Sequence, residues 1–266
     1  MKSGRLQIIL KVALAFSAYF ILIRLFKDIK VYLDGWTGYG LLSYLIAYAI
    51  AIVPILAVVR WIVRKGHAWG ALGLRGHLFR AWFWAMVFAS PMLLGGLAFY
   101  PFPARVEADQ LLAGTLIAGF MEELVYRAFL FGMLFYHARL GFVPSVLVNA
   151  IAFALGHWQP ELGFAGNIPV LLVTCAAGGF FAWLYVEWER NIWLPVALHA
   201  LMNLSWSLFD MGGNAAGGAL SNLLRAGTIA LAIALTLWYK QRFQQGPGVN
   251  RKNLLIQKES ASGAVT

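Results

Sequence analysis

Residues 39–63 read YGLLSYLIAYAIAIVPILAVVRWIV, and this stretch decides the fold. Its only charged residue is Arg60, close to its end. A membrane-spanning helix needs about 20 mostly apolar residues, so the stretch is long enough to cross a bilayer. It indicates a helix that is surrounded by lipid and not by water.

The same pattern repeats along the chain. Seven further apolar stretches of this type are Leu6–Phe26, Leu78–Tyr100, Leu111–Phe135, Phe142–Trp158, Ile168–Glu187, Ile192–Phe209 and Gly218–Tyr239. The expected fold is all-α: a polytopic membrane protein with about eight transmembrane helices, forming one domain over residues 1–240. Basic residues and the Gly246-Pro247-Gly248 sequence predict a basic, disordered tail over residues 241–266.

The composition supports a membrane protein. The 266 residues are 61% hydrophobic and 12% charged, with a mean hydropathy of +0.72, whereas a soluble domain has about 45–50% apolar and about 25% charged residues. The net charge of +10 does not indicate a nucleic-acid partner, because the 21 Lys and Arg lie between apolar blocks and flank membrane helices. The single cysteine, Cys175, excludes an internal disulfide and a CxxC metal or redox pair.

Basic residues in short loops predict the orientation in the membrane. If eight spans place both termini inside, the cytoplasmic side holds the larger basic set, which is Lys2, Arg5, Arg60, Arg64, Lys65, Arg75, Arg80, Arg139, Arg190, Lys240, Arg242, Arg251, Lys252 and Lys258. The opposite side holds the smaller set, which is Arg24, Lys27, Lys30, Arg105 and, at the edge of the last helix, Arg225. We therefore expect cytoplasmic N- and C-termini, in the inner membrane if the chain is bacterial.

Three acidic and basic residues interrupt the apolar stretch Leu111–Phe135. Ionisable groups at the centre of a membrane helix cost at least about 2.5–3.5 kcal/mol each, so they are functional candidates by default. Glu123 and Arg127 are four residues apart and can pair on one helix face, whereas Glu122 points about 100° away. The excess carboxylate is a candidate general acid or base. The alternative is that both acids belong to a helix-packing ion network with Arg127.

Two histidines lie in later apolar stretches. His157 shares a helix face with Phe153 and Asn149, and His199 shares one with Asn203. Each histidine alone is also compatible with a packing role. If Glu122 and the two histidines converge, they suit water activation and oxyanion stabilisation, which is the chemistry of a hydrolase. Intramembrane serines are a weaker alternative, because none of Ser90, Ser145, Ser205 and Ser207 lies in a Gly-x-Ser-x-Gly setting.

The order E-E-x-x-x-R, F-x-x-x-H and H-x-x-x-N, over the motif-bearing core at about residues 111–209, resembles the CPBP family of CAAX proteases and bacteriocin-processing (Abi) proteins. Its eukaryotic relatives are the Ras-converting CAAX endopeptidases. The resemblance implies an intramembrane endopeptidase with an intramembrane catalytic cavity. By motif position, Glu122 helped by His157 would activate water, and His199 and Asn203 would stabilise the oxyanion. Glu123 and Arg127 would be supporting residues that hold their helix in place.

The sequence leaves open whether the site uses a metal cofactor. Glu122, His157 and His199 match the number and type of ligands in a catalytic zinc site. However, no HExxH motif is present, and the histidines lie in separate stretches. We therefore expect a glutamic-type mechanism without a cofactor, with a zinc-dependent metalloprotease as the alternative.

The expected partners are membrane lipid and a membrane-associated protein or peptide substrate, either lipidated or not. In the eukaryotic relatives the substrate is a prenylated CaaX tail. In a bacterium, a small peptide or the C-terminal anchor of an exported protein would be expected instead. The rival function is a non-catalytic membrane scaffold or immunity protein, or a proton-coupled transporter that uses the buried carboxylates.

Overall fold

The computed structural model describes residues 4–63, 66–102 and 107–256, and within these ranges the regular structure is helical, without strands. The long helices are α1 (Arg5–Arg24), α3 (Gly40–Ile62), α5 (Leu78–Phe99), α8 (Phe142–Gly156), α9 (Gly163–Glu187), α10 (Trp193–Leu208) and α11 (Ala219–Arg242). Shorter elements are α2 (Phe26–Thr37), α4 (Ala68–Ala71) and η4 (Pro160–Leu162). Of the residues used to predict the orientation, Lys2, Arg64, Lys65, Arg105 and Lys258 lie outside the described ranges.

The all-helical architecture predicted from the apolar stretches is confirmed within the described ranges. Within the described ranges, α1, α3, α5, α11 and the unit Pro160–Glu187 are long and apolar enough to cross a membrane, by length and composition. Helix α8 is apolar as well, but it has only 15 residues. A total of eight crossings therefore stays a prediction.

The predicted fourth span is helical but not a regular α-helix. With a few residues before and after it, it forms the consecutive elements α6 (Ala108–Leu112), η1 (Ala113–Ile117), α7 (Ala118–Glu122), η2 (Glu123–Phe131) and η3 (Met133–His137). The η1, η2 and η3 elements have the wider π-helical hydrogen bonding. Such π segments are rare and occur frequently at functional sites. Here the change from α to π falls between Glu122 and Glu123, which the sequence pattern does not signal.

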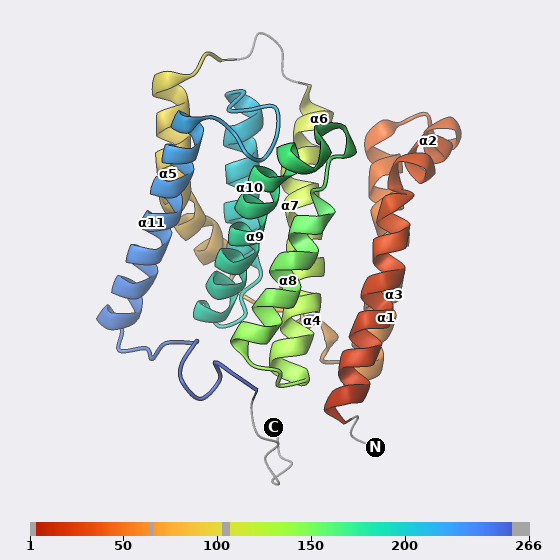
Figure 1. The fold of residues 1–266 in the computed structure, drawn as a ribbon, viewed down its shortest axis with the longest axis vertical. Coiled ribbons are helices and arrows are strands. Elements are labelled where there is room, and N and C mark those ends of the chain that lie inside the picture. The colour runs from red at the N-terminus through yellow and green to blue at the C-terminus, as the bar shows by residue number, and fades with distance from the viewer. Residues whose placement is uncertain (1–3, 64–65, 103–106, 257–266) are drawn as a thin grey trace.

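Figure 1 shows α1 and α3 together at one edge of the bundle and α5 and α11 at the other. Between them, the segment 108–137 contacts α1, α3, α8, α9 and α10, so it occupies the centre. Helix α1 begins and α11 ends at the same end of the bundle (Figure 1). This arrangement agrees with an even number of crossings.

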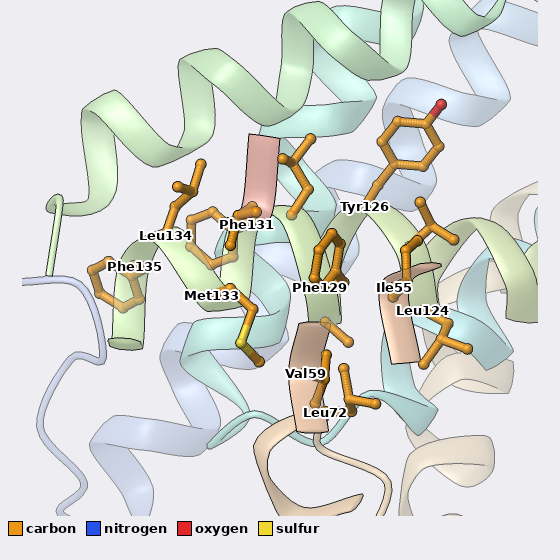
Figure 2. Close-up of a cluster of buried hydrophobic side chains, with 14 of the residues drawn as sticks. Ile55, Val59, Leu72, Leu124, Tyr126, Phe129, Phe131, Met133, Leu134 and Phe135 are labelled. Carbon is orange, nitrogen blue, oxygen red and sulfur yellow. The ribbon is translucent and has the colours of Figure 1, made fainter. Parts of the chain in front are cut away.

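A buried apolar cluster surrounds the central segment (Figure 2). All nine residues of η2 are buried, and its side chains Leu124 and Phe129 belong to the same cluster as Ile55, Val59 and Leu72 from neighbouring elements. Burying one such side chain contributes roughly 1.5–3 kcal/mol. The cluster therefore fixes the helix that carries the two adjacent glutamates.

Part of the segment predicted to be a disordered tail contacts the bundle. The Glu187 carboxylate accepts the backbone N–H groups of Gly248 and Val249 at 2.9 and 3.0 Å, which fixes the chain after α11 against the end of α9. Farther on, the carbonyls of Asn253 and Leu254 accept the N–H groups of the first two residues of α8 at 2.8 and 3.0 Å. These N–H groups have no partner inside the helix, so the segment caps α8. Residues 257–266 lie outside the described ranges.

Candidate active site

The core of the site is a fully buried ion pair inside the central segment. The Nε atom of Arg127 lies 3.2 Å from Oε2 of Glu123, as the four-residue spacing predicts, and neither side chain is exposed. The Arg127 guanidinium also lies over the rings of Phe153 and Phe181, 4.2 and 5.2 Å from their centroids. Two aromatic faces and one carboxylate therefore surround this buried cation.

Glu123 connects that ion pair to α10. Its Oε1 atom lies 2.7 Å from Nδ1 of His199, while Oε2 faces Arg127. Close packing of the helices makes this contact possible, because a side chain at Gly119 would meet the backbone N of Ala200 at only 3.3 Å. An ionised carboxylate only accepts hydrogen bonds, so Nδ1 carries the proton. The His199 ring is further held by stacking on Phe181, at 5.4 Å between centroids.

Glu122 has a different environment. Its side chain is 24% exposed, and Oε2 lies 3.8 Å from Nε2 of His199. Among the described residues this Oε2 atom has no hydrogen-bond partner. The carboxylate interacts electrostatically with the phenol groups of Tyr19, Tyr48 and Tyr126. Of the two adjacent acids, Glu122 is therefore the more exposed one, and Glu123 is the one paired with Arg127.

His157 and Asn203 are held by backbone carbonyls. His157 follows the last residue of α8, and its Nδ1 atom lies 2.9 Å from the carbonyl oxygen of Phe153. A carbonyl only accepts hydrogen bonds, so Nδ1 is the donor and Nε2 is left as an acceptor. Asn203 donates a hydrogen bond to the carbonyl of Gly114 at 3.2 Å. Asn149 is fully buried and donates to the carbonyl of Gly178 at 3.0 Å, so it joins α8 to α9.

Three of the predicted site residues line one cavity of about 330 Å³, namely His157, His199 and Asn203. Its other lining residues are Met92, Phe153, Val173, Thr174, Ala177, Phe181, Met202, Trp206, Gly212, Gly213, Asn214, Ala215 and Arg225. Glu122 is not part of this lining but borders it through His199. None of Ser90, Ser145, Ser205 and Ser207 lines the cavity, which leaves the serine alternative without geometric support.

The zinc alternative requires three converging ligands. Zinc would require Glu122, His157 and His199 to converge, but in the described ranges no group of three His, Cys, Asp or Glu side chains is arranged to hold a metal ion. The Nδ1 atoms of the two histidines are engaged by Phe153 and Glu123, which leaves Nε2 of each ring as the atom that could bind a metal.

Sequence reasoning missed three features of the site. It paired Glu123 with Arg127 but gave it no contact with His199, which only the packing of α7 against α10 creates. It did not place the rings of Phe153 and Phe181 around the guanidinium of Arg127. It used Arg225 only as a flanking charge, although Arg225 lines the cavity.

Fold and site together define an all-helical, membrane-type protein in which a buried arginine–glutamate–histidine network borders a cavity. Residues 104–205 match the family model described as Type II CAAX prenyl endopeptidase Rce1-like. This match covers the segment with all three motifs, so it confirms the resemblance to the CAAX protease family and supports an intramembrane protease function. No curated protein matches the chain.

Proposed function

We propose that this protein is an intramembrane endopeptidase that hydrolyses a peptide bond near the C-terminal tail of a membrane-associated or lipidated protein or peptide. The observation that carries the proposal is the position of His199. Its ring is fixed by Glu123 through Nδ1 and lines the cavity, while its Nε2 atom lies 3.8 Å from Oε2 of the partly exposed Glu122 side chain. Acid–base groups and a substrate-sized space are thus adjacent within an apolar bundle.

In the proposed reaction, the Glu122 carboxylate takes a proton from a water molecule, and the resulting hydroxide attacks the carbonyl carbon of the substrate. The acceptor Nε2 atom of His157 holds the second proton of this water by a hydrogen bond. The carbonyl π electrons move to the oxygen, which becomes an oxyanion. When the tetrahedral intermediate collapses, the C–N bond breaks and the protonated Glu122 returns its proton to the leaving nitrogen.

The oxyanion requires hydrogen-bond donors, and His199 and Asn203 supply them. Because Nδ1 of His199 already donates to Glu123, Nε2 can donate only if the ring is an imidazolium. Two carboxylates lie close to the ring, Glu123 at 2.7 Å from Nδ1 and Glu122 at 3.8 Å from Nε2. Removing one such donor commonly lowers kcat about 10²–10³-fold. Glu123 and Arg127 are positioning residues that act through His199.

The proposed membrane placement follows the charge pattern. We infer cytoplasmic termini, and α1 begins at the same end of the bundle as α11 ends, as an even number of crossings requires (Figure 1). The lining of the cavity is mostly apolar, which suits a hydrophobic peptide or a lipidated tail. The proposed mechanism is of the glutamic type and uses no metal.

Purified wild type and Glu122→Gln in nanodiscs test the proposal. Both would be incubated with a quenched prenylated CaaX peptide and a library of transmembrane-tail peptides, with and without a strong zinc chelator. Cleavage by the wild type alone, unaffected by the chelator, is expected. Glu189→Gln is the matched control, because Glu189 is exposed and lies outside the cavity.

Each contrary result has a defined meaning. Full activity of Glu122→Gln would contradict the role of Glu122. Wild-type activity that the chelator removes and zinc restores would indicate that the histidines are metal ligands. A third result would support a transporter instead of a protease. In that case the wild type would cleave no peptide but would carry out proton-coupled solute flux in liposomes, and Glu122→Gln would lose this flux.

A further inference from the structure

Tyr126 is a buried polar residue beside the candidate site, and the proposed reaction gives it no role. It lies in η2, is only 5% exposed, and its phenol group interacts electrostatically with the Glu122 carboxylate. Because it follows Glu122 by four residues, both side chains lie on one face of the central segment, with Cβ atoms about 5–6 Å apart. Figure 2 shows the hydroxyl directed away from the labelled apolar side chains.

The hydroxyl of Tyr126 also reaches the end of α8 that carries His157. Gly156 is the last residue of α8, and His157 follows it directly. A Cβ atom at Gly156 would lie 2.9 Å from Oη of Tyr126, so the hydroxyl occupies the space that a side chain would need there. The glycine therefore lets the phenol approach the backbone next to the histidine that we propose to hold the attacking water.

Aromatic contacts fix the ring of Tyr126. It packs edge to face against Phe16 of α1 and Phe153 of α8, with centroids 5.8 and 5.0 Å away. The Phe153 ring is in turn 4.6 Å from the His157 ring. These contacts involve the rings alone, so a phenylalanine would make them equally well. The packing therefore accounts for an aromatic ring at this position but not for its hydroxyl.

The hydroxyl of Tyr126 is available for a water molecule. In the part of the chain that the structure describes, no side chain forms a hydrogen bond with it, and Oε2 of Glu122 has no hydrogen-bond partner either. A bound water needs two to four polar partners. Tyr126 offers one donor, and Glu122 and Nε2 of His157 offer two acceptors. Together these groups match the two hydrogens and one lone pair of a water molecule.

We propose that Tyr126 is a further catalytic residue, whose hydroxyl donates a hydrogen bond to the oxygen of the attacking water. The inference rests on the proposed endopeptidase function. Glu122 and His157 accept the two hydrogens of this water, and the remaining lone pair of its oxygen attacks the carbonyl carbon. As one proton moves to Glu122, negative charge develops on the water oxygen. The Tyr126 O–H group stabilises that charge and keeps its own proton.

Tyr126→Phe tests this role, because it removes the hydroxyl and keeps the ring. We expect kcat to fall about 10- to 100-fold, as for the loss of one hydrogen bond to a charged group, with KM and melting temperature unchanged. Tyr136→Phe is the matched control, because this tyrosine of the same central segment contacts Arg190 and not Glu122. It should keep the wild-type kcat. A wild-type kcat in Tyr126→Phe would overturn the proposal.

Gly156→Ala separates a chemical role of the hydroxyl from a spacing role. Because its Cβ atom would lie 2.9 Å from Oη of Tyr126, this variant should lower both the melting temperature and kcat. In Tyr126→Phe/Gly156→Ala the Cβ atom would meet Cζ at an ordinary 3.9 Å, so the melting temperature should recover. The kcat of the double variant should stay as low as that of Tyr126→Phe. Recovery of the wild-type kcat would show that the hydroxyl only sets the spacing, and would overturn the proposal.

Binding of non-cleavable peptides separates this inference from the protease itself. A phosphinate peptide carries two oxygens on its tetrahedral centre, one of them at the position of the attacking water, whereas a reduced-amide peptide carries none. Tyr126→Phe should bind the phosphinate about 10- to 100-fold more weakly than the wild type does and should bind the reduced amide equally well.

Equal phosphinate affinities of the wild type and Tyr126→Phe would overturn the role of Tyr126, even if cleavage occurs. If the wild type cleaves no peptide, the proposed protease fails. In that case, a preference for the phosphinate that Tyr126→Phe removes would still support the water site.

Discussion

Nδ1 of His199 lies 2.7 Å from Oε1 of Glu123, although 76 positions separate the two residues along the chain. The same carboxylate faces Arg127 through its other oxygen. One buried side chain therefore fixes both the cation of the central segment and the proton on the histidine. Because Oε2 of Glu122 lies 3.8 Å from Nε2 of His199, the relationship also orients the ring toward the carboxylate that we propose as the general base.

Loss of Glu123 should destabilise the protein, because it leaves Arg127 as an uncompensated buried charge. We expect Glu123→Gln to lower the free energy of unfolding by about 3–5 kcal/mol. Glu123→Gln/Arg127→Met should recover part of this loss, since both charges are then absent. Thermal unfolding in one detergent would measure all three proteins. A double variant less stable than Glu123→Gln would contradict the pairing.

Gly178 permits the close approach of α8 and α9. A Cβ atom there would lie 2.8 Å from Cα of Ala150, and the Gly178 carbonyl accepts the hydrogen bond of Asn149. We expect Gly178→Val to destabilise the protein by about 1–3 kcal/mol through overpacking, and to lower activity by shifting His157. The adjacent Gly179→Val is the control, because its Cβ would meet Val146 at an ordinary 3.7 Å. Equal melting temperatures for both variants would disprove the close approach.

His137, after the predicted span Leu111–Phe135, should make stability depend on pH. Burial, with a smaller contribution from the Arg190 guanidinium, lowers its pKa from 6.5 to about 4. Between these values the unfolded chain binds a proton that the folded protein does not, so stability falls as the pH drops from about 6.5 to 4. We expect a loss on the order of 1–2 kcal/mol from this residue between pH 7 and 5.

His137→Gln should show a smaller difference between its melting temperatures at pH 7 and pH 5 than the wild type does. An unchanged difference would mean that other groups control the acid sensitivity.

Glu187 should hold the chain after α11 on the bundle. Its carboxylate accepts the N–H groups of Gly248 and Val249, and it pairs with Lys240 at 3.0 Å. We expect Glu187→Gln to weaken these charge-assisted contacts and to increase the rate of limited proteolysis within residues 243–256 several-fold. The exposed neighbour Glu189, changed to Gln, should leave the rate unaltered. Similar cleavage rates in both variants would show that the carboxylate does not hold the segment.

The sequence by itself determined the helical, membrane-type architecture, because apolar runs such as Tyr39–Val63 have the length and composition of membrane helices. It also determined the pair of Glu123 with Arg127, since a spacing of four residues places both on one helix face whatever the surrounding fold. Both are local properties. The three spaced motifs further indicated the family, which the match over residues 104–205 confirms.

Only the tertiary structure decided how distant helices meet. The contact of Glu123 with His199 depends on how closely α7 packs against α10 at Gly119, and no local pattern encodes an interhelical distance. The position of Arg225 in the cavity lining likewise depends on the fold. From the sequence alone, a basic residue near a helix end is interpreted as a charge that flanks the membrane. Side-chain chemistry can be read along one chain, but its convergence requires the packing of several helices.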